Sequence, residues 1–211
     1  MKKVLKIIGI VMMIETERLI LRPFTEADAE DVFEYLHEPA VHCFACMKLE
    51  SLEAARKELM QRQGDELYLA IVLKETGKVI GEIFAHPEGM APEDENMDTY
   101  SPCWMLNLNY TGNGYAYEAA HAFFDFLFRE KGARRIYAYT EDYNLPSQRL
   151  CERLGMRREG LFMEFVSFVG NPDGTPHFEN TMQYAILKKE WTKNKSPACS
   201  VSASPITGTH S

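Results

Sequence analysis

Hydrophobic and polar positions along the chain follow two different periods, and the changes from one to the other predict a succession of strands and helices. Short runs in which apolar and polar residues alternate predict strands, and apolar residues that recur every three or four positions predict helices. The predicted strands occupy residues 19–23, 67–73, 79–85, 103–109, 135–140, 161–169 and 178–187. The predicted helices occupy residues 25–36, 51–63, 115–131 and 144–154.

Turn residues support the boundaries between these elements. Gly77 lies between two strands and predicts a hairpin, and Asn171-Pro-Asp-Gly174 predicts another. Gly132 and Gly155 follow the last apolar positions of two helices, where glycine commonly ends a helix. The pattern contains no internal repeat. It predicts a single mixed α+β domain, with a mostly antiparallel central sheet of about six to seven strands and about four flanking helices.

The two ends of the chain differ from the middle. Residues 1–12 are basic and apolar, but Lys6 interrupts the apolar run and no cleavage site of small residues follows. We expect this segment to lie outside the fold and the domain to occupy residues 13–191. Residues 192–211 are rich in Ser, Thr, Pro and Ala without apolar periodicity, and we expect them to be disordered.

Charge and cysteine content narrow the function classes. The formal net charge is −8, which disfavours binding to a nucleic-acid backbone and favours cationic partners such as amines. The five cysteines are odd in number and scattered, so we expect reduced thiols and a cytoplasmic protein. Cys43 and Cys46 form a single C-x-x-C without a second spaced pair, so we expect no metal site. No membrane-spanning segment is expected either.

The most informative stretch is the turn between the strand at 103–109 and the helix at 115–131. Gly112 and Gly114 lie two residues apart in this turn. Without Cβ atoms the backbone can approach a bulky anion, and the amide groups at the start of the helix can bind phosphate oxygens. A pyrophosphate fits this arrangement, although the glycines are also compatible with a purely structural connection. A dinucleotide fold would need a third glycine where Tyr117 stands, and a nucleoside-triphosphate loop would need Gly-Lys-Ser/Thr.

Several segments together resemble one known family. Residues 111–119 (TGNGYAYEA) resemble the acyl-coenzyme A (acyl-CoA) signature of the GNAT superfamily of N-acetyltransferases, Gln/Arg-x-x-Gly-x-Gly/Ala, with Asn109 in the first position. Asn144-Leu-Pro-Ser147, followed by Glu152-Arg-Leu-Gly-Met156, resembles the second coenzyme A (CoA) element of that family. Residues 14–24 and 184–191 resemble the first and last strands of the ribosomal-protein N-acetyltransferase branch, the RimJ and RimL type.

The resemblance implies a sheet that splays open at an acyl-CoA site, acetyl-CoA as cosubstrate, no metal, and direct transfer of the acetyl group to an amine in a ternary complex. A strand edge would bind the pantetheine arm, the glycine turn the pyrophosphate, and Asn144 and Ser147 the rest of the arm. The residues implied in cofactor binding are Leu106, Asn107, Leu108, Thr111, Gly112, Asn113, Gly114, Tyr115, Ala116, Asn144 and Ser147.

The catalytic roles implied by the resemblance are a base for the ammonium group and an acid for the departing thiolate. Glu164 is the first candidate base and Glu82 the second, although each is also typical of a solvated carboxylate on a strand face. Many relatives have a tyrosine acid seven residues after Asn144, but Cys151 stands there. Ser147 becomes the candidate acid, and a hydroxyl that caps the helix is the structural alternative.

The acceptor predicted in this way is a primary amine, on either a protein N-terminus or a small molecule. The replacement at Cys151 leaves a second function open, a catalytically weak or inactive module that binds acyl-CoA as a sensor. We expect neither nucleic-acid nor membrane partners, and the sequence leaves a homodimer open.

Overall fold

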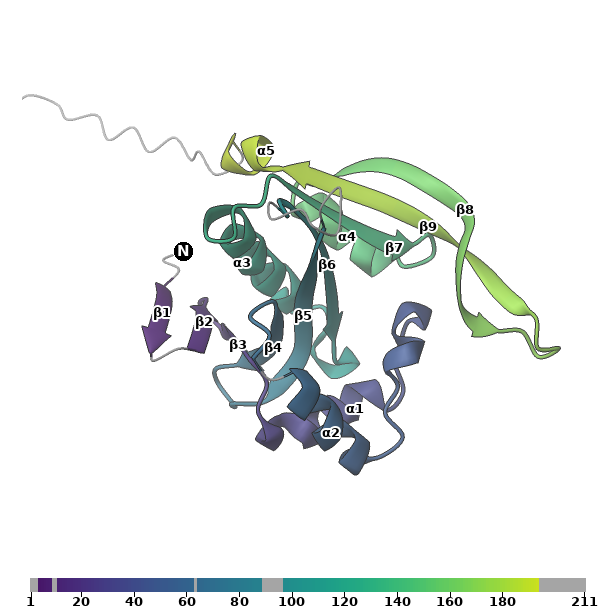
Figure 1. The fold of residues 1–211 in the computed structure, drawn as a ribbon, viewed down its shortest axis with the longest axis horizontal. Helices are drawn as coiled ribbons and strands as arrows, with labels where there is room; N and C mark the ends of the chain where they lie inside the picture. The colour runs from purple at the N-terminus through teal and green to yellow at the C-terminus, as the bar shows by residue number, and fades with distance from the viewer. Residues whose placement is uncertain (1–3, 9–10, 63, 89–96, 194–211) are drawn as a thin grey trace, which may run out of the picture.

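The computed structural model describes residues 4–8, 11–62, 64–88 and 97–193, and within these residues one sheet runs through the whole molecule (Figure 1). Its strands lie in the order β1-β2-β3-β4-β5-β6-β7-β9-β8. They are β1 (Val4–Ile8), β2 (Val11–Glu15), β3 (Leu19–Arg22), β4 (Tyr68–Leu73), β5 (Val79–Glu88), β6 (Thr99–Leu106), β7 (Arg135–Glu141), β8 (Arg157–Gly170) and β9 (Pro176–Leu187).

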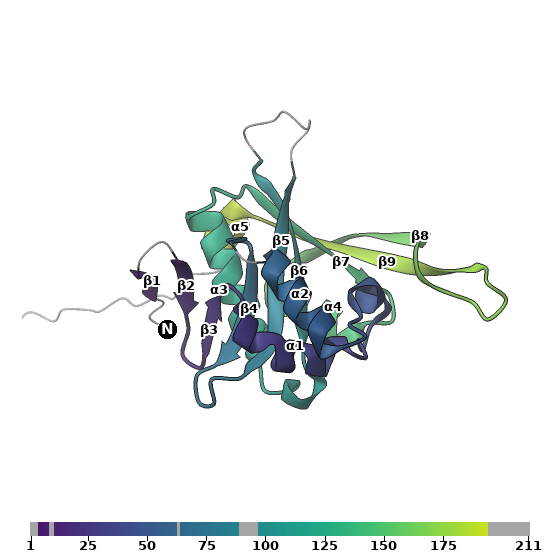
Figure 2. The same ribbon diagram turned by 60° about the horizontal axis from the view of Figure 1, so that its bottom comes forward.

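Helices lie on both faces of this sheet. The α-helices are α1 (Ala29–Leu36), α2 (Leu52–Arg62), α3 (Tyr115–Arg129), α4 (Leu145–Arg153) and α5 (Lys188–Lys193). Three short 3-10 helices join them: η1 (Glu26–Asp28), η2 (His42–Met47) and η3 (Leu108–Tyr110). Figure 2 shows α1 and α2 in front of the sheet and α3 behind it. Among the described residues, no helix is long and apolar enough to cross a membrane.

The two helical layers enclose two hydrophobic cores, and the alternation along β4 explains why. Leu69 and Ile71 belong to the core that contains α3, whereas Ala70 and Val72 belong to the core that contains α1 and α2. Because successive side chains of a strand point to opposite faces, a strand covered on both faces is apolar throughout. The long phenylalanine-rich helix α3 contributes Phe123, Phe124, Leu127 and Phe128 to the first core, as its helical spacing predicts.

The sheet opens between β6 and β7, the two central strands that run parallel. They pair only at Thr99 with Arg135 and at Tyr100 with Ile136, and then diverge. Every other neighbouring pair of strands is antiparallel across the described sheet. The edge of β6 that faces β7 therefore has no strand partner beyond Tyr100. This divergence is the splay that the sequence predicted.

The α+β class and the mostly antiparallel sheet are confirmed, but the strand count was too low. The described sheet has nine strands because residues 4–15 form two of them at its edge. This arrangement differs from the expectation that residues 1–12 lie outside the fold, since Val4–Ile8 pairs with Val11–Glu15. The described residues also contain a fifth α-helix, α5, after the last strand. From residue 194 onward, the tail predicted to be disordered lies outside the described residues.

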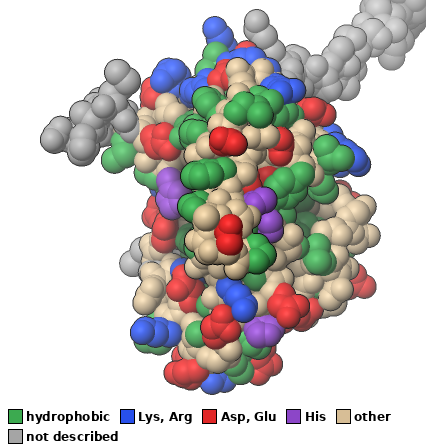
Figure 3. Space-filling view, turned by 90° about the vertical axis from the view of Figure 1, so that its right-hand side faces the viewer, with side chains coloured by type: hydrophobic (Ala, Val, Ile, Leu, Met, Phe, Trp, Pro, Cys, Tyr) green, Lys and Arg blue, Asp and Glu red, His purple; other side chains and the backbone are tan. Residues whose placement is uncertain are grey.

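At the other edge of the sheet, β8 and β9 extend beyond the rest of the molecule as a two-stranded hairpin (Figure 1). The register of this pair shifts between Phe162 and Val166. Seen from that side, hydrophobic, acidic and histidine side chains are mixed over the surface, with basic side chains mainly toward the two ends (Figure 3). Met163, Phe165 and Phe178 are among the exposed apolar side chains of the hairpin.

Candidate active site

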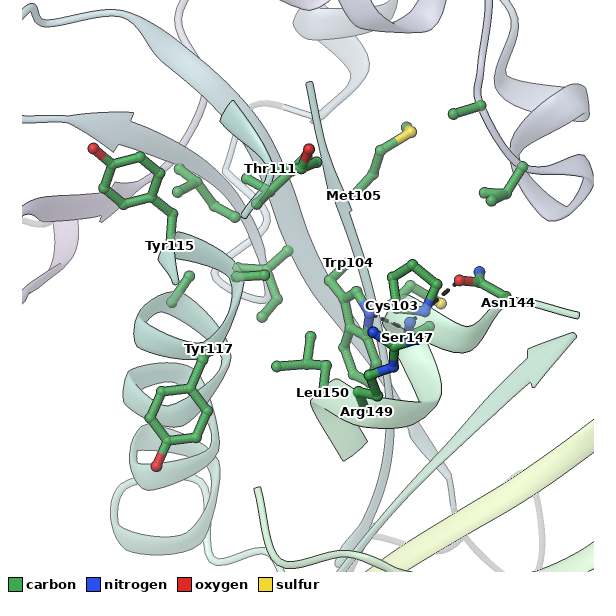
Figure 4. A pocket seen from close by; sticks show the side chains of 18 of the residues that line it. Cys103, Trp104, Met105, Thr111, Tyr115, Tyr117, Asn144, Ser147, Arg149 and Leu150 are labelled. Carbon is green, nitrogen blue, oxygen red and sulfur yellow. Dashed lines mark hydrogen bonds between the residues drawn. The ribbon is translucent and has the colours of Figure 1, made fainter. Parts of the chain in front are cut away.

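A cavity of about 450 Å³ occupies the space between the diverging strands β6 and β7. Its wall is formed mainly by β6, the end of β7, η3 with the turn and first residues of α3, the first turns of α4, and η2 with the residues before it. Figure 4 shows the labelled side chains of β6, α3 and α4 around this space. The cavity is the point where the two sequence elements that resemble the GNAT family meet.

The glycine turn lies at one end of the cavity, at the N-terminus of α3. Gly112 and Gly114 have φ angles of 80° and 81°, a left-handed conformation that side chains disfavour. A Cβ atom added at Gly112 would have nothing within 4 Å. Within the described part of the chain, the amide groups of residues 112–116 donate to no protein acceptor. Five unpaired N–H groups at the positive end of a helix dipole form a site for an anion.

Two residues from the N-terminal side of the sheet hold this turn in place. Arg18 donates to the Asn113 carbonyl over 2.9 Å and pairs with Glu118 over 2.7 Å, and its guanidinium stacks on Tyr115. Thr16 donates its hydroxyl proton to Glu118 over 2.6 Å. Burial raises the pKa of Glu118, but the hydrogen bonds from Thr16 and Arg18 outweigh burial and leave the pKa below its usual value. The carboxylate near the anion site is therefore already neutralised by Arg18.

Asn144 and Ser147, at the start of α4, both line the cavity. Asn144 caps the helix, because its Oδ1 accepts from the Ser147 amide over 3.2 Å. The Ser147 hydroxyl does not cap the helix; it accepts from the Trp104 indole Nε1 over 3.2 Å (Figure 4). Among the described residues its own proton has no acceptor, so it can be donated into the cavity. Capping of the helix, the structural alternative for Ser147, is therefore performed by Asn144.

Arg149 and Arg153 also line the cavity, and the sequence reasoning missed them. They lie four residues apart on α4, so they share one helix face. Arg153 lies over the Tyr117 ring, with its Cζ 4.6 Å from the ring centroid. Among the described residues, neither arginine has a carboxylate within ion-pair distance, so both charges are available to an anionic ligand. The spacing from Asn144 could have indicated this, since the first turns of α4 border the same site.

Glu141 is a further residue that the sequence reasoning missed. It is the last residue of β7, it lines the cavity, and it is only 4% exposed. Its Oε1 accepts from the Cys43 amide over 3.3 Å, and its Oε2 accepts from Asn144 Nδ2 over 3.0 Å. The carboxylate therefore lies between η2 and the start of α4.

The thiols around the cavity are protonated at neutral pH. Burial raises the pKa of Cys103, on the cavity wall, to about 11, and the charges of Glu82 and Glu141 contribute. Burial raises the pKa of Cys151 to about 12. Cys151 is fully buried in the core and does not line the cavity, so its role is packing. Among the described residues no group of His, Cys, Asp or Glu side chains is arranged to hold a metal ion.

Three of the predicted site residues have other roles. Asn107 is buried, and its side chain accepts from the Asn109 amide and donates to Glu34, because the chain turns into η3 there instead of continuing the strand. Glu82 is fully buried in a network with Arg62, Tyr35 and Tyr68, away from the cavity wall. Glu164 is exposed on the projecting hairpin, at φ 49°, and also does not line the cavity.

The remaining predicted cofactor residues are brought together. The cavity wall contains Leu106, Leu108, Thr111, Gly112, Gly114, Tyr115, Ala116, Asn144 and Ser147. Asn113 contributes its amide, while its side chain donates back to the Tyr110 and Thr111 carbonyls.

Comparisons with known proteins agree with this geometry. Residues 18–157 match the family model described as an acetyltransferase (GNAT) domain. The Bacillus subtilis protein named "Uncharacterized N-acetyltransferase YnaD" is 32% identical over 181 residues, which cover 85% of this chain and 99% of that protein. The chain therefore belongs to the GNAT family, and it is an acetyltransferase.

Solved structures show the same fold. A GNAT-family acetyltransferase from Bacillus anthracis superimposes with a TM-score of 0.72 at 31% identity, covering 85% of this chain and all of the other. A ribosomal-protein acetyltransferase from Vibrio fischeri superimposes with a TM-score of 0.65 at 20% identity, covering 85% of this chain and 98% of the other. At this lower identity the likeness shows the fold alone.

Proposed function

We propose that this protein transfers an acetyl group from acetyl-CoA directly to a primary amine, on either a protein N-terminus or a small molecule. The observation that carries the proposal is the row of unpaired amide groups at residues 112–116, at the end of a cavity between two diverging strands. A pyrophosphate accepts hydrogen bonds from such groups, and the helix dipole adds to the attraction.

The other parts of the cosubstrate fit the same cavity. The unpaired edge of β6 offers main-chain groups to the amide-like pantetheine arm, in the manner of an added strand. Asn144 and Ser147 lie on the opposite wall. The free Ser147 proton is positioned to be donated to the thiolate that leaves. Arg149 and Arg153 supply positive charge for the phosphates.

Direct transfer is favoured over a cysteine intermediate. A thiol attacks as its thiolate, and the high pKa of Cys103 keeps it protonated at neutral pH. The acetyl group would then pass straight to the amine nitrogen. The resemblance to the ribosomal-protein branch favours a protein N-terminus as the acceptor.

Calorimetry with acetyl-CoA, followed by an assay of thiol release with a panel of amines, tests this function. Gly114→Glu places a side chain and a negative charge among the amide donors. We expect it to weaken acetyl-CoA binding about 100-fold or more, since two lost hydrogen bonds to a charged group cost about 3 kcal/mol.

Gly174→Glu is the matched control. Gly174 has φ 84° and open space around it, but it lies in the turn between β8 and β9. The control therefore has the same backbone strain and added charge without touching the cavity. Retained acetyl-CoA binding in Gly114→Glu would show that the turn is only structural, and absence of binding in the wild-type protein would refute the proposed function.

A further inference from the structure

Six carboxylates are buried in the described residues, and Glu141 differs from the other five. Each of the others has a basic side chain as partner: Asp28 has Arg22, Glu82 has Arg62, Glu118 has Arg18, Asp125 has Arg129, and Glu179 has His42. Within the described part of the chain, Glu141 has no Lys, Arg or His nitrogen within 4.0 Å. A buried charge without a partner is costly unless a ligand compensates it.

The position of Glu141 makes a ligand the natural partner. Its carboxylate lines the cavity and is held from two sides, by the Cys43 amide and by Asn144 Nδ2. Asn144 also caps the helix that carries Ser147, so one side chain orients both the carboxylate and the start of α4. The Glu141 carboxylate, which can accept a proton, and the Ser147 hydroxyl, which can donate one, therefore line the same cavity.

We propose that Glu141 binds the ammonium group of the acceptor and then takes its proton. This inference rests on the proposed function and assigns the base within it. The ammonium gives one proton to the Glu141 carboxylate, and the freed lone pair forms the new C–N bond as the C–S bond of the thioester breaks. The nitrogen then loses a second proton, and the thiolate gains one proton in turn and leaves as a thiol. The proton on Glu141 returns to solvent.

The other titratable groups that face Glu141 are two thiols and a phenol, and all three keep their protons at neutral pH. Cys43 of η2, Cys103 of β6 and Tyr143 after β7 face it, and burial raises the pKa of all three. The negative charge of Glu141 raises each of these pKa values further. His42 and Glu179 lie beyond Tyr143 and are paired with each other.

The charges on the cavity wall also indicate the class of acceptor. Glu141 is the one acidic residue on the wall formed by described residues, and the two other charges there, Arg149 and Arg153, are positive. The wall also contains the apolar residues Val41 and Phe44, on either side of Cys43, which donates to Glu141. Such a site fits one ammonium group with uncharged neighbours, as at a peptide N-terminus. A polyamine would bring further positive charges without carboxylates to receive them.

The test uses Glu141→Gln with two acceptors, glycinamide as a minimal monocationic amine and spermidine as a polycation. We expect kcat/KM for glycinamide to fall about 100-fold or more at neutral pH, the usual contribution of a general base. Acetyl-CoA affinity, measured by calorimetry, stays near the wild-type value. Because the variant lacks the base, it acts only on amine that is already deprotonated in solution. That fraction grows as pH rises toward the pKa of the amine, so the ratio of wild-type to variant kcat/KM falls.

Glu179→Gln is the matched control, because Glu179 is also a buried carboxylate but has His42 as its partner. We expect this control to keep the shape of the wild-type pH profile. If Glu141→Gln does not fold, Glu141→Asp retains the charge at a shorter reach, and we expect a lower kcat with the wild-type pH profile. A purely structural role would instead give a constant ratio at every pH, or an equal loss of acetyl-CoA affinity, and either result overturns the inference.

The comparison of the two amines, together with acetyl-CoA binding, distinguishes failure of the inference about Glu141 from failure of the proposed function. We expect the wild-type kcat/KM for glycinamide to exceed that for spermidine, and the reverse order overturns the assigned acceptor class. Wild-type protein that binds acetyl-CoA and acetylates neither amine also overturns the inference while leaving the cosubstrate site in place. Wild-type protein that does not bind acetyl-CoA refutes the proposed function itself.

Discussion

Arg149 and Arg153 provide the clearest prediction at the scale of single residues. Both line the cavity from α4, and a cation near a phosphate contributes about 1.5 kcal/mol or more. We expect Arg153→Ala to weaken acetyl-CoA binding about tenfold, which corresponds to about 1.4 kcal/mol. Binding of acetyl-pantetheine, which has no phosphates, stays unchanged. Calorimetry with the two ligands measures both effects.

Arg129→Ala serves as the control for this prediction. Arg129 is the last residue of α3, its side chain is exposed, and its partner is Asp125. The control removes an arginine of comparable exposure that does not line the cavity. Equal losses for acetyl-CoA and acetyl-pantetheine in Arg153→Ala would mean that the arginine supports α4 rather than binding phosphate.

The sequence predicted those site residues that lie close together in the chain and missed those that only the fold brings together. Gly112 and Gly114 share one turn, and Asn144 and Ser147 share the start of one helix, so local pattern was sufficient. Glu141 required the packing of η2 against the end of β7, because Cys43 lies 98 residues away from it. Glu82 was a candidate base because the sequence did not show its ion pair with Arg62, which is 20 residues away.

At the scale of elements, β5 and β6 approach each other closely where β6 reaches the cavity. Gly81 in β5 lies opposite Leu106, the last residue of β6. A Cβ atom at Gly81 would lie 2.2 Å from the Met105 carbonyl oxygen, which is backbone and cannot rotate away. We expect Gly81→Ala to lower the free energy of unfolding by about 1–3 kcal/mol, as overpacking does. Urea denaturation followed by circular dichroism measures this change.

The control for Gly81 is Gly160→Ala in β8. A Cβ atom there would lie 3.6 Å from the Phe162 ring, an ordinary contact. Because Gly81 supports the end of β6 at the cavity, we expect Gly81→Ala to weaken acetyl-CoA binding as well, while Gly160→Ala retains it. Equal stability of the two alanine variants would contradict the close approach.

Most elements followed from the periodicity of the sequence, but β6 did not. The predicted strand at 103–109 lies at 99–106 in the structure, because the side chain of Asn107 accepts from the Asn109 amide and turns the chain into η3. Alternation alone cannot detect such a cap, since Leu106 and Leu108 continue the pattern. The edge strands at residues 4–15 were missed because the basic and apolar run was interpreted as a terminal extension, and only the fold shows β1 paired with β2 and β2 paired with β3.

For the molecule as a whole, the Glu82 network ties the two helices on one face to the sheet. Tyr35 of α1, Arg62 of α2 and Tyr68 of β4 all contact the Glu82 carboxylate in β5. Burial raises the pKa of Tyr35 well above its ordinary value of 10.0, and the charge of Glu82 raises it further. The same two causes raise the pKa of Tyr68, although Arg62 acts in the opposite direction.

These raised values predict how stability depends on alkaline pH. Above pH 10 the unfolded chain loses the tyrosine proton while the folded chain keeps it, so the unfolded state binds fewer protons and stability falls as pH rises. Below pH 10 both states are protonated and the contribution is complete. One such tyrosine lowers the free energy of unfolding by about 1.4 kcal/mol for each pH unit above 10.

We expect Tyr35→Phe to be less stable than wild type at pH 8, since it loses a hydrogen bond to Glu82. Its free energy of unfolding should nevertheless decline less steeply between pH 10 and 11.5. Urea denaturation across this range measures both slopes, with Tyr139→Phe, which removes an exposed ring hydroxyl, as the control. Parallel curves for wild type and Tyr35→Phe would mean that Tyr35 ionises equally in the folded and unfolded states, contrary to its burial against Glu82.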